Sequence, residues 1–262
     1  MPIASNLDQL DALRRGVGVL DLGGWRLVRV LGGDAERWLN DLVTANVAAL
    51  APGGSVRSLL LGPTGRIRAD LVVHRRAGDV VLLQSPGQPS PIDELLEPYV
   101  LSSDVRIERF EGSLAVVPTT GPVWTVSPDP PAGAVAVGPA AFESWRIALG
   151  LARFPTDLDQ DSLPAEAGLD EMPVVDRSKG CYLGQESVAK VRNLGHPTRL
   201  VVAVEAARPV TAGRSVIAGP GAVGVLTSVD TEGDGRLAIA RIRWDARDAI
   251  LSTDDGVALD RR

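Results

Sequence analysis

The sequence predicts an α+β protein that ends in a small all-β unit. Short apolar runs bounded by Gly and Pro fill residues 55–84, which is typical of consecutive strands. Apolar residues at three- and four-residue spacing, as at Ala35, Trp38 and Leu39, indicate helices among these strands. Beyond Thr198 the apolar runs are all strand-like and are separated by Gly- and Asp-rich turns, which favours a small barrel or sandwich.

The first half of the chain is expected to alternate helices with strands. A short helix carries Leu7, Leu10 and Leu13, with Ser5 as its N-cap, and Asp34 is expected to cap the next helix. A third helix opens at the Ser90-Pro91 dipeptide, with Pro91 at its first position, and ends early at Pro98. The expected strands run over residues 25–31, 55–61, 67–74, 80–84 and 105–110, with a turn at 62–65.

The second half begins with strands and passes through an irregular segment to the all-β unit. Phe142, Trp145 and Leu149 form a helical stripe that ends at Gly150, a natural C-cap. Residues 153–179 are polar and rich in proline, which predicts a surface segment able to form a site. A short helix is expected over 185–191. The expected strands are 114–118, 123–126, 200–204, 215–217, 222–229 and 237–244.

Composition limits the classes of function. The 262 residues allow two or three domains, and the net charge of −6 with no basic run longer than two residues argues against a general nucleic-acid groove. One cysteine excludes an intrachain disulfide and an all-cysteine metal or iron–sulfur site within one subunit. With His74 and His196 as the two histidines, no bound metal is expected. No signal peptide or membrane span is expected, so the predicted location is the cytoplasm.

The most informative stretch is the octapeptide Lys-Gly-Cys-Tyr-Leu-Gly-Gln-Glu at residues 179–186, which holds the single cysteine, Cys181. An ammonium at Lys179 would favour the reactive thiolate form of this cysteine. Gly180 and Gly184 allow the backbone to turn sharply or to approach a ligand closely.

A purely structural interpretation of the octapeptide stays open. In it, Cys181 is a small buried apolar residue and Tyr182 packs in the core, while Lys179 is solvated. Gln185 and Glu186 would then hydrogen-bond backbone amides.

The octapeptide resembles the K-G-C-[FY]-x-G-Q-E signature of the YgfZ family of folate-binding proteins, which are relatives of the glycine-cleavage aminomethyltransferase (T-protein). Weaker similarity to the same proteins is spread over residues 30–39, 65–71, 146–150 and 224–228. The resemblance implies three domains of antiparallel α/β structure and a small barrel around a central folate-sized cavity. Their expected ranges are 1–48 with 113–196, the inserted 49–112, and 197–262.

The resemblance also implies binding of tetrahydrofolate or a derivative. Asp70 is then expected at the pterin edge and Trp145 against the pterin face. The anionic tail would meet arginines, for which the candidates are Arg66, Arg146 and Arg192.

Two positions depart from the pattern of the related transferases. Ala69 replaces the first of two adjacent acids, and Ala148 replaces an acid expected to bind the pterin. The first change counts against aminomethyl transfer, and the second weakens the case for tight folate binding.

The first functional hypothesis is therefore a folate-binding accessory protein, rather than a conventional enzyme. It would support the assembly or repair of iron–sulfur enzymes, with an essential thiol at Cys181. That thiol could relay sulfur or an oxidising equivalent, ligate a cluster shared with a partner, or form a mixed disulfide. The alternatives are a tetrahydrofolate-dependent aminomethyltransferase and a non-catalytic module that has lost folate. The first hypothesis predicts that Cys181 is exposed and that it shares a cleft with Asp70.

Overall fold

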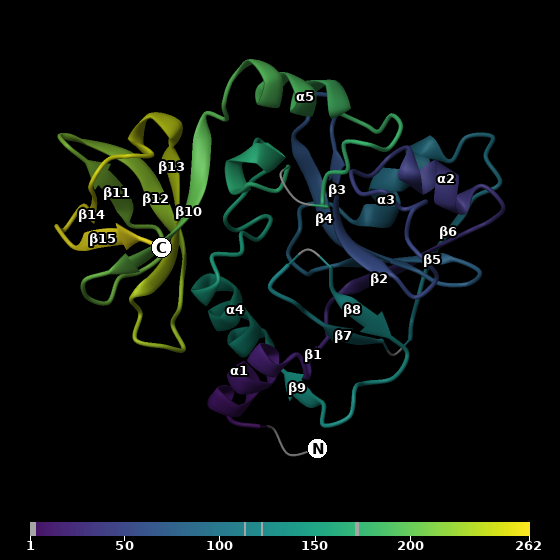
Figure 1. The fold of residues 1–262 in the computed structure, drawn as a ribbon, viewed down its shortest axis with the longest axis horizontal. Coiled ribbons are helices and arrows are strands. Elements are labelled where there is room, and N and C mark those ends of the chain that lie inside the picture. The colour runs from purple at the N-terminus through teal and green to yellow at the C-terminus, as the bar shows by residue number, and fades with distance from the viewer. Residues whose placement is uncertain (1–3, 113, 122, 171–172) are drawn as a thin grey trace.

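The computed structural model describes residues 4–112, 114–121, 123–170 and 173–262. The described chain divides visibly into a mixed α/β body and a β-barrel that lies beside it (Figure 1). Helix α1, Asn6–Arg15, opens the body, and Ser5 Oγ accepts the amide of Asp8 at 3.2 Å, as the predicted N-cap requires. A glycine in the left-handed region, Gly16, ends the helix.

A short parallel pair of strands follows that the sequence analysis did not predict. Strand β1, Gly18–Leu20, pairs with β9, Val135–Val137, more than 100 residues later. Helix α4, Pro139–Ala148, then lies against α1 (Figure 1). These contacts bring the start of the chain next to the segment that precedes the predicted site loop.

The largest sheet is antiparallel and has the strand order β3-β4-β5-β2-β6. Its strands are β2 Arg26–Leu31, β3 Ser55–Leu61, β4 Ile67–Arg75, β5 Val80–Gln84 and β6 Arg106–Arg109. One face is covered by helix α2, Ala35–Asn40, and by α3, Ile92–Leu96, which continues as the 3₁₀ turn Glu97–Tyr99. The other face packs on a core that includes residues of α1 and α4.

Two local predictions in this unit need correction. Asp34 precedes α2, but its side chain makes no capping bond to that helix. Its Oδ2 accepts the backbone amide of Asp104 instead, at 2.9 Å. Pro91 is the extended N-cap of α3 rather than its first residue, because a helix dihedral is reached only at Ile92.

The domain boundary expected at residue 48 does not coincide with a boundary of the sheet. Strand β2 lies between β5 and β6, so residues 26–31 belong to the same sheet as residues 55–109. The sequence pattern could not show this, because strand pairing across 50 residues leaves no local signal.

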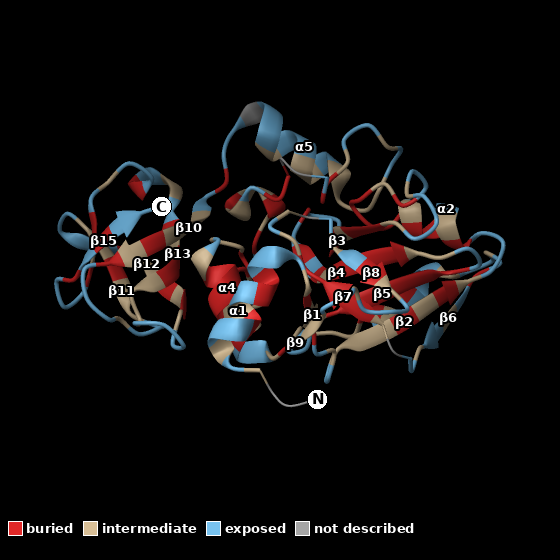
Figure 2. Cartoon of the chain, turned by 60° about the horizontal axis from the view of Figure 1, so that its bottom comes forward, coloured by how far each residue is buried: buried red, intermediate tan, exposed pale blue. Residues whose placement is uncertain are grey.

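The segment between the sheet and the barrel is mostly irregular. It contains the strand pair β7, Ala115–Val117, and β8, Thr125–Ser127, and, after α4, the 3₁₀ turn Pro164–Ala167. Helix α5, Gln185–Leu194, then crosses from the body to the barrel (Figure 1). Figure 2 shows this helix as exposed or intermediate over residues 185–193, whereas α4 is buried along the side that carries Trp145.

The C-terminal strands close into a six-stranded barrel in the order β10-β13-β12-β11-β14-β15. They are β10 Arg199–Ala206, β11 Ser215–Ala218, β12 Gly221–Val229, β13 Leu237–Arg243, β14 Leu251–Thr253 and β15 Ala258–Arg261, with a 3₁₀ turn at Trp244–Ala246. Apolar side chains such as Leu226 and Ile242 fill the interior. The predicted all-β barrel is confirmed, although its last two strands were not predicted.

In the part of the chain that the structure describes, we find no helix with the length and apolarity needed to cross a bilayer.

Candidate functional site

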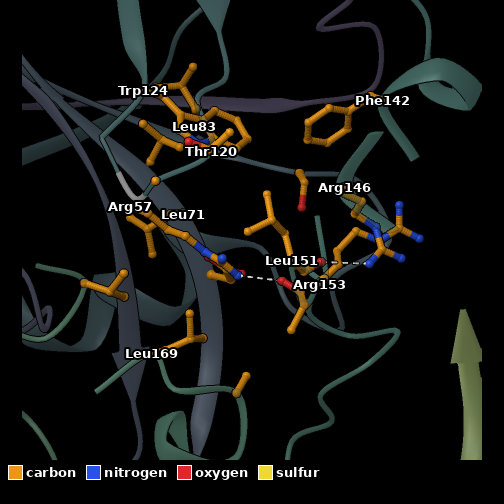
Figure 3. A pocket seen from close by; sticks show the side chains of 18 of the residues that line it. Arg57, Leu71, Leu83, Thr120, Trp124, Phe142, Arg146, Leu151, Arg153 and Leu169 are labelled. Carbon is orange, nitrogen blue, oxygen red and sulfur yellow. Dashed lines mark hydrogen bonds and ion pairs between the residues drawn. The ribbon is translucent and has the colours of Figure 1, made fainter. Parts of the chain in front are cut away.

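A pocket of about 890 Å³, its open mouth included, lies between the β3–β5 part of the large sheet, α4 and the irregular segment that follows α4 (Figure 3). This volume is within the range of small-molecule sites. The lining residues are Trp25, Arg57, Asp70, Leu71, Val72, Leu83, Ser85, Thr120, Gly121, Trp124, Phe142, Arg146, Gly150, Leu151, Ala152, Arg153, Ala167, Leu169 and Val174.

Aromatic side chains form one end of the pocket. The ring centroids of Trp25 and Trp124 are 6.3 Å apart, and Trp124 meets Phe142 edge to face at 5.9 Å. Figure 3 shows Trp124 and Phe142 together at this end, with Arg57 and Arg153 further along the pocket. A flat, largely apolar ring would find suitable contacts on these surfaces.

A partly buried ion pair lies in the wall of the same pocket. Arg57 on β3 donates from Nε to Asp70 Oδ1 at 3.0 Å and from Nη2 to Asp70 Oδ2 at 2.6 Å. The two side chains are 15% and 13% exposed. Burial acts to lower the pKa of Arg57, but the charge and hydrogen bonds of Asp70, with a contribution from Asp157, outweigh it and raise that pKa.

Arg146 lines the pocket, but its guanidinium is fully engaged by the protein. The side chain is 3% exposed. Nε and Nη2 donate to Glu143, Nη1 donates to Asp157 and to the Leu151 carbonyl, and Nη2 also donates to Ser228. All five N–H groups therefore have partners, and a structural role for Arg146 replaces the expected contact with a ligand tail.

The other residues predicted to contact folate lie outside the pocket lining. Trp145 is 5% exposed and packs in the core, with its ring 5.8 Å from that of Phe142. Arg66 is exposed and donates to the Asp161 carbonyl, and Arg192 is exposed on α5. Of the predicted set, Asp70 and Arg146 line the pocket.

The two alanines that depart from the family pattern do not face the pocket either. Ala69 is fully buried in the core under α2, on the opposite face of β4 from Asp70. Adjacent strand residues point to opposite faces, so an acid at position 69 would enter that core. Ala148 is half-buried at the end of α4 and is not among the lining residues. Neither alanine removes an acid from this pocket.

The octapeptide is held in place by its lysine. Lys179 Nζ donates to the carbonyls of Val43 at 2.6 Å and Ala45 at 2.9 Å, and also to that of Asn40. These three acceptors use all the ammonium protons. The lysine thereby ties the site loop to the segment after α2, and activation of Cys181 by Lys179 stays a prediction.

Further bonds reinforce this connection. Thr44 Oγ1 donates to the Val174 carbonyl at 2.6 Å, and the Asp176 amide donates to the Thr44 carbonyl at 3.0 Å. Asp176 Oδ1 in turn accepts the hydroxyl and amide of Ser178, which lowers the pKa of Asp176. The backbone leading into the octapeptide is thus held by hydrogen bonds of Val174 and Asp176 with Thr44 and of Lys179 with the same segment.

Lys179 should titrate far below an ordinary lysine. Burial lowers its pKa from 10.5 to about 8, against the opposing charges of Asp41 and Asp176. Because the unfolded chain then binds more protons between about pH 8 and 10.5, this group stabilises the fold increasingly as pH rises through that window. Its contribution is complete above 10.5 and is lost as pH falls through about 8.

The chain contains two lysines, so this prediction can be measured directly. We expect the side-chain NMR signals of Lys179 in lysine-labelled protein to titrate with a midpoint near pH 8. Lys190, exposed on α5, provides the internal reference, and Lys179→Met assigns the signals. A Lys179 midpoint that stays near 10.5 would show that the ammonium is not desolvated.

Cys181 follows this fixed segment and is exposed, as predicted. Tyr182 is half-buried against the core beneath the β3–β4 hairpin, and burial raises the pKa of its hydroxyl. Gln185 Oε1 accepts the Tyr182 amide at 3.3 Å, while Glu186 is exposed in the first turn of α5. The octapeptide thus combines fixed side chains with one accessible thiol.

The octapeptide and the β3–β4 hairpin are in direct contact. The turn glycine Gly65 lies under Ser187, and Gly184 lies against the Gly62 carbonyl. This proximity was predicted. Asp70 lines the pocket and Cys181 does not, so the structure supports the shared location but not a shared cleft.

Among the described residues, no group of three or more His, Cys, Asp and Glu side chains is placed to hold a metal ion.

The aromatic and charged lining residues that sequence reasoning missed are Trp25, Arg57, Trp124, Phe142 and Arg153. In the β3–β4 hairpin Leu59 is opposite Asp70, so Arg57 is the diagonal neighbour of Asp70 on the same face. The turn at 62–65 alone could not predict this, because the strand register shifts between Leu60 and Leu61. The aromatic residues come from three separate segments, and local patterns could not bring them together.

Comparison with known proteins is consistent with this architecture. Residues 4–123 match the model of the GCVT N-terminal domain family. A crystal structure of the glycine cleavage system aminomethyltransferase T from Bartonella henselae superposes with a TM-score of 0.79. At 21% identity, it covers 100% of this chain and 90% of its own. The chain therefore has the mixed α/β fold of that aminomethyltransferase.

Two groups of relatives are similar in sequence. An iron–sulfur cluster assembly factor IBA57 homologue, mitochondrial, of Mycosarcoma maydis is 26% identical over 67% of this chain. This chain spans 54% of that relative's length. An aminomethyltransferase of Corynebacterium jeikeium is 21% identical over 87% of this chain and 79% of its own length. The chain thus has homologues in both an assembly-factor group and a transferase group.

Proposed function

We propose that this protein binds a reduced folate and supports the assembly or repair of iron–sulfur clusters in other proteins, with Cys181 as its reactive group. The observation that carries the proposal is the pairing of an open, aromatic-walled pocket with an exposed thiol on a braced loop. Similarity to an iron–sulfur cluster assembly factor supports the same assignment.

The pocket suits a folate in shape and chemistry. Trp25, Trp124 and Phe142 offer surfaces for a flat ring, and Arg57 lines the same space for an anionic tail. When bound, a reduced folate would supply one-carbon or redox chemistry. The protein side chains would orient it and exclude water.

In this proposal the thiol contacts a partner rather than the pocket ligand, because Cys181 is exposed and is not among the lining residues. Cys181 is exposed, and the backbone before it is fixed through Lys179 and Asp176 to neighbouring segments. Such an arrangement presents a thiol in a constant position, which suits exchange with another protein. Iron–sulfur enzymes or assembly proteins are the proposed partners.

A single pair of measurements separates the two halves of this function. Tetrahydrofolate should quench the fluorescence of the pocket tryptophans, with the same affinity in the unmodified protein and in Cys181→Ala. In cells lacking the native gene, Cys181→Ala should fail to restore iron–sulfur enzyme activity, whereas the exposed-surface control Ala189→Ser should restore it.

Different failures would identify different alternatives. Full restoration by Cys181→Ala would remove the thiol from the function. Absence of folate binding, with restoration still dependent on Cys181, would favour a module that has lost folate.

A second candidate is a folate-dependent aminomethyltransferase. The placement of Ala69 outside the pocket, with Asp70 retained in it, favours this candidate more than the sequence did. Engagement of both Asp70 oxygens by Arg57 opposes it, because the oxygens that would have to contact the reacting group are already occupied by the guanidinium. Turnover in an aminomethyl-transfer assay would establish the transferase.

A further inference from the structure

The carboxylate in the pocket wall is held rigidly by protein groups. Both oxygens of Asp70 accept from Arg57, and Gln88 bonds the Asp70 backbone on each side, accepting from its amide at 3.0 Å and donating to its carbonyl at 2.6 Å. A second hydrogen of Arg57 Nη2 reaches the Ala152 carbonyl at 2.9 Å. Figure 3 shows this bond crossing toward the segment that follows α4.

One end of the Arg57 guanidinium remains available. Its Nε and Nη2 hydrogens are used by Asp70 and Ala152, while Nη1 has no partner among the described residues. The one buried side-chain atom without a partner in the described chain is an oxygen of Glu166. Nη1 of Arg57 is therefore not buried, and it presents two N–H donors to the pocket that Arg57 lines.

The other charged groups of the pocket do not compete with these donors. Arg146 is saturated by protein acceptors, and Arg153 pairs with Glu143 at 2.9 Å and with Thr156 near the surface. The lining contains three arginines and one aspartate, and both oxygens of that aspartate are engaged by Arg57. The pocket consequently offers a ligand the unused N–H donors of Arg57 rather than a free carboxylate.

We propose that Arg57 is the specificity-determining residue of this pocket, and that its Nη1 binds a carboxylate carried by a flat aromatic ligand. Asp70 is then a positioning residue, which aims the guanidinium. This inference rests on the proposed folate-binding function, and it names Arg57 as the side chain that recognises the ligand's carboxylate. The chain thereby uses Asp70 to orient a donor, whereas a free acid at this position would accept from the ligand.

A pair of matched probes isolates this contact. Para-aminobenzoyl-glutamate carries an aromatic ring and two carboxylates, and its diamide has nearly the same shape without charge. We expect the unmodified protein to bind the dicarboxylate about tenfold to a hundredfold more tightly than the diamide, as measured by calorimetry. A residue that merely supports the pocket would affect both probes equally.

Two variants remove the proposed contact between Arg57 and the ligand carboxylate, called the anchor below. Arg57→Lys keeps a positive charge beside Asp70 but loses the planar guanidinium with its several N–H donors. Arg57→Gln combined with Asp70→Asn removes both charges together. In each, the preference for the dicarboxylate should fall toward one, while diamide binding changes less than about threefold. Arg26→Lys is the control, because Arg26 on β2 forms a similar two-contact pair with Asp93 of α3, outside the pocket.

Asp70→Asn alone tests positioning. It should reduce the preference for the dicarboxylate while Arg57 is still present, and Asp70→Glu should restore part of it. Equal loss of both probes in these variants would show a structural role and overturn the proposal. An unchanged preference in Arg57→Lys and in the double variant would overturn it as well.

The outcomes distinguish this inference from the proposed function. Binding of the dicarboxylate probe through Arg57 without binding of tetrahydrofolate would sustain the anchor and refute the folate assignment. Tetrahydrofolate binding that is insensitive to Arg57→Lys would refute the anchor alone. Failure of the unmodified protein to bind either probe or tetrahydrofolate would refute both.

Discussion

Replacing Arg146 by methionine should destabilise the protein by about 3–5 kcal/mol, the usual result of breaking a buried ion pair from one side. Asp157 is fully buried and loses its cation in this variant. Its remaining donors are the Arg153 amide at 2.9 Å and the hydroxyls of Thr227 and Ser228, which do not balance its charge. The carboxylate must then be protonated or hydrated, and either costs free energy.

The same change should loosen the attachment of the barrel to the body. Arg146 lies on α4, Asp157 on the irregular segment, and Ser228 on β12, so one cluster joins three parts of the chain. Hydrogen exchange should therefore increase in β12 and in α4, in addition to the loss of global stability.

Urea unfolding provides the measurement, and an exposed pair provides the control. Arg15 and Asp11 on α1 are each 60% exposed, so Arg15→Met should cost about 0.5 kcal/mol or less. The double change Arg146→Met with Asp157→Leu should cost clearly less than the sum of the single changes, because no charge is then left buried. A loss below about 1 kcal/mol in Arg146→Met would show that the cluster is already hydrated.

This cluster also shows what a linear pattern can and cannot predict. Arg146 and the Thr227-Ser228 pair were each noticed as parts of separate motifs, and the structure joins them through Asp157, which no motif contained. Their meeting depends on how the barrel docks against α4. The sequence therefore suggested a ligand contact for Arg146, and could not show that it connects α4 to the barrel.

Elements with long, regular periodicity were predicted well. Strands β3 and β4, the turn between them and helix α1 fall close to their expected ranges, because the hydrophobic period and the turn residues agree there. Strands β1 and β9 were missed, since three residues carry too little pattern and their partner is distant. Trp145 was expected to face the ligand, but Phe142 of the same helix lines the pocket instead, because tertiary packing decides which ring is covered.

The octapeptide was recognised by its residues, but its glycines have a more definite role than the sequence showed. Gly184 has a φ of 82°, and a Cβ built there would lie 2.5 Å from the Gly62 carbonyl oxygen and 3.2 Å from Gly65 Cα. Gly65 itself has a φ of 75°, and a Cβ built there would lie 2.8 Å from Ser187 Cβ. The hairpin turn and the start of α5 thus meet backbone to backbone.

Gly184→Ala should therefore cost about 2–4 kcal/mol of unfolding free energy. A side chain in the left-handed region contributes about 1–2 kcal/mol of this, and displacement of the hairpin backbone contributes a comparable amount. The neighbouring Gly180→Ala is the matched control, because no atom lies within 4 Å of its ideal Cβ and the residue is exposed. That control should change stability by less than about 0.5 kcal/mol.

Denaturant unfolding of the two variants tests the contact between the hairpin turn and the start of α5. Hydrogen exchange locates the effect. We expect faster exchange in α5 and at the 62–65 turn in Gly184→Ala, with the barrel core unaffected, because the clash lies between these two segments. Equal, small losses in both variants would show that the turn can move away at little cost. The octapeptide would then be held mainly by Lys179 and its three carbonyl acceptors, and Lys179→Met should produce the larger disturbance at Cys181.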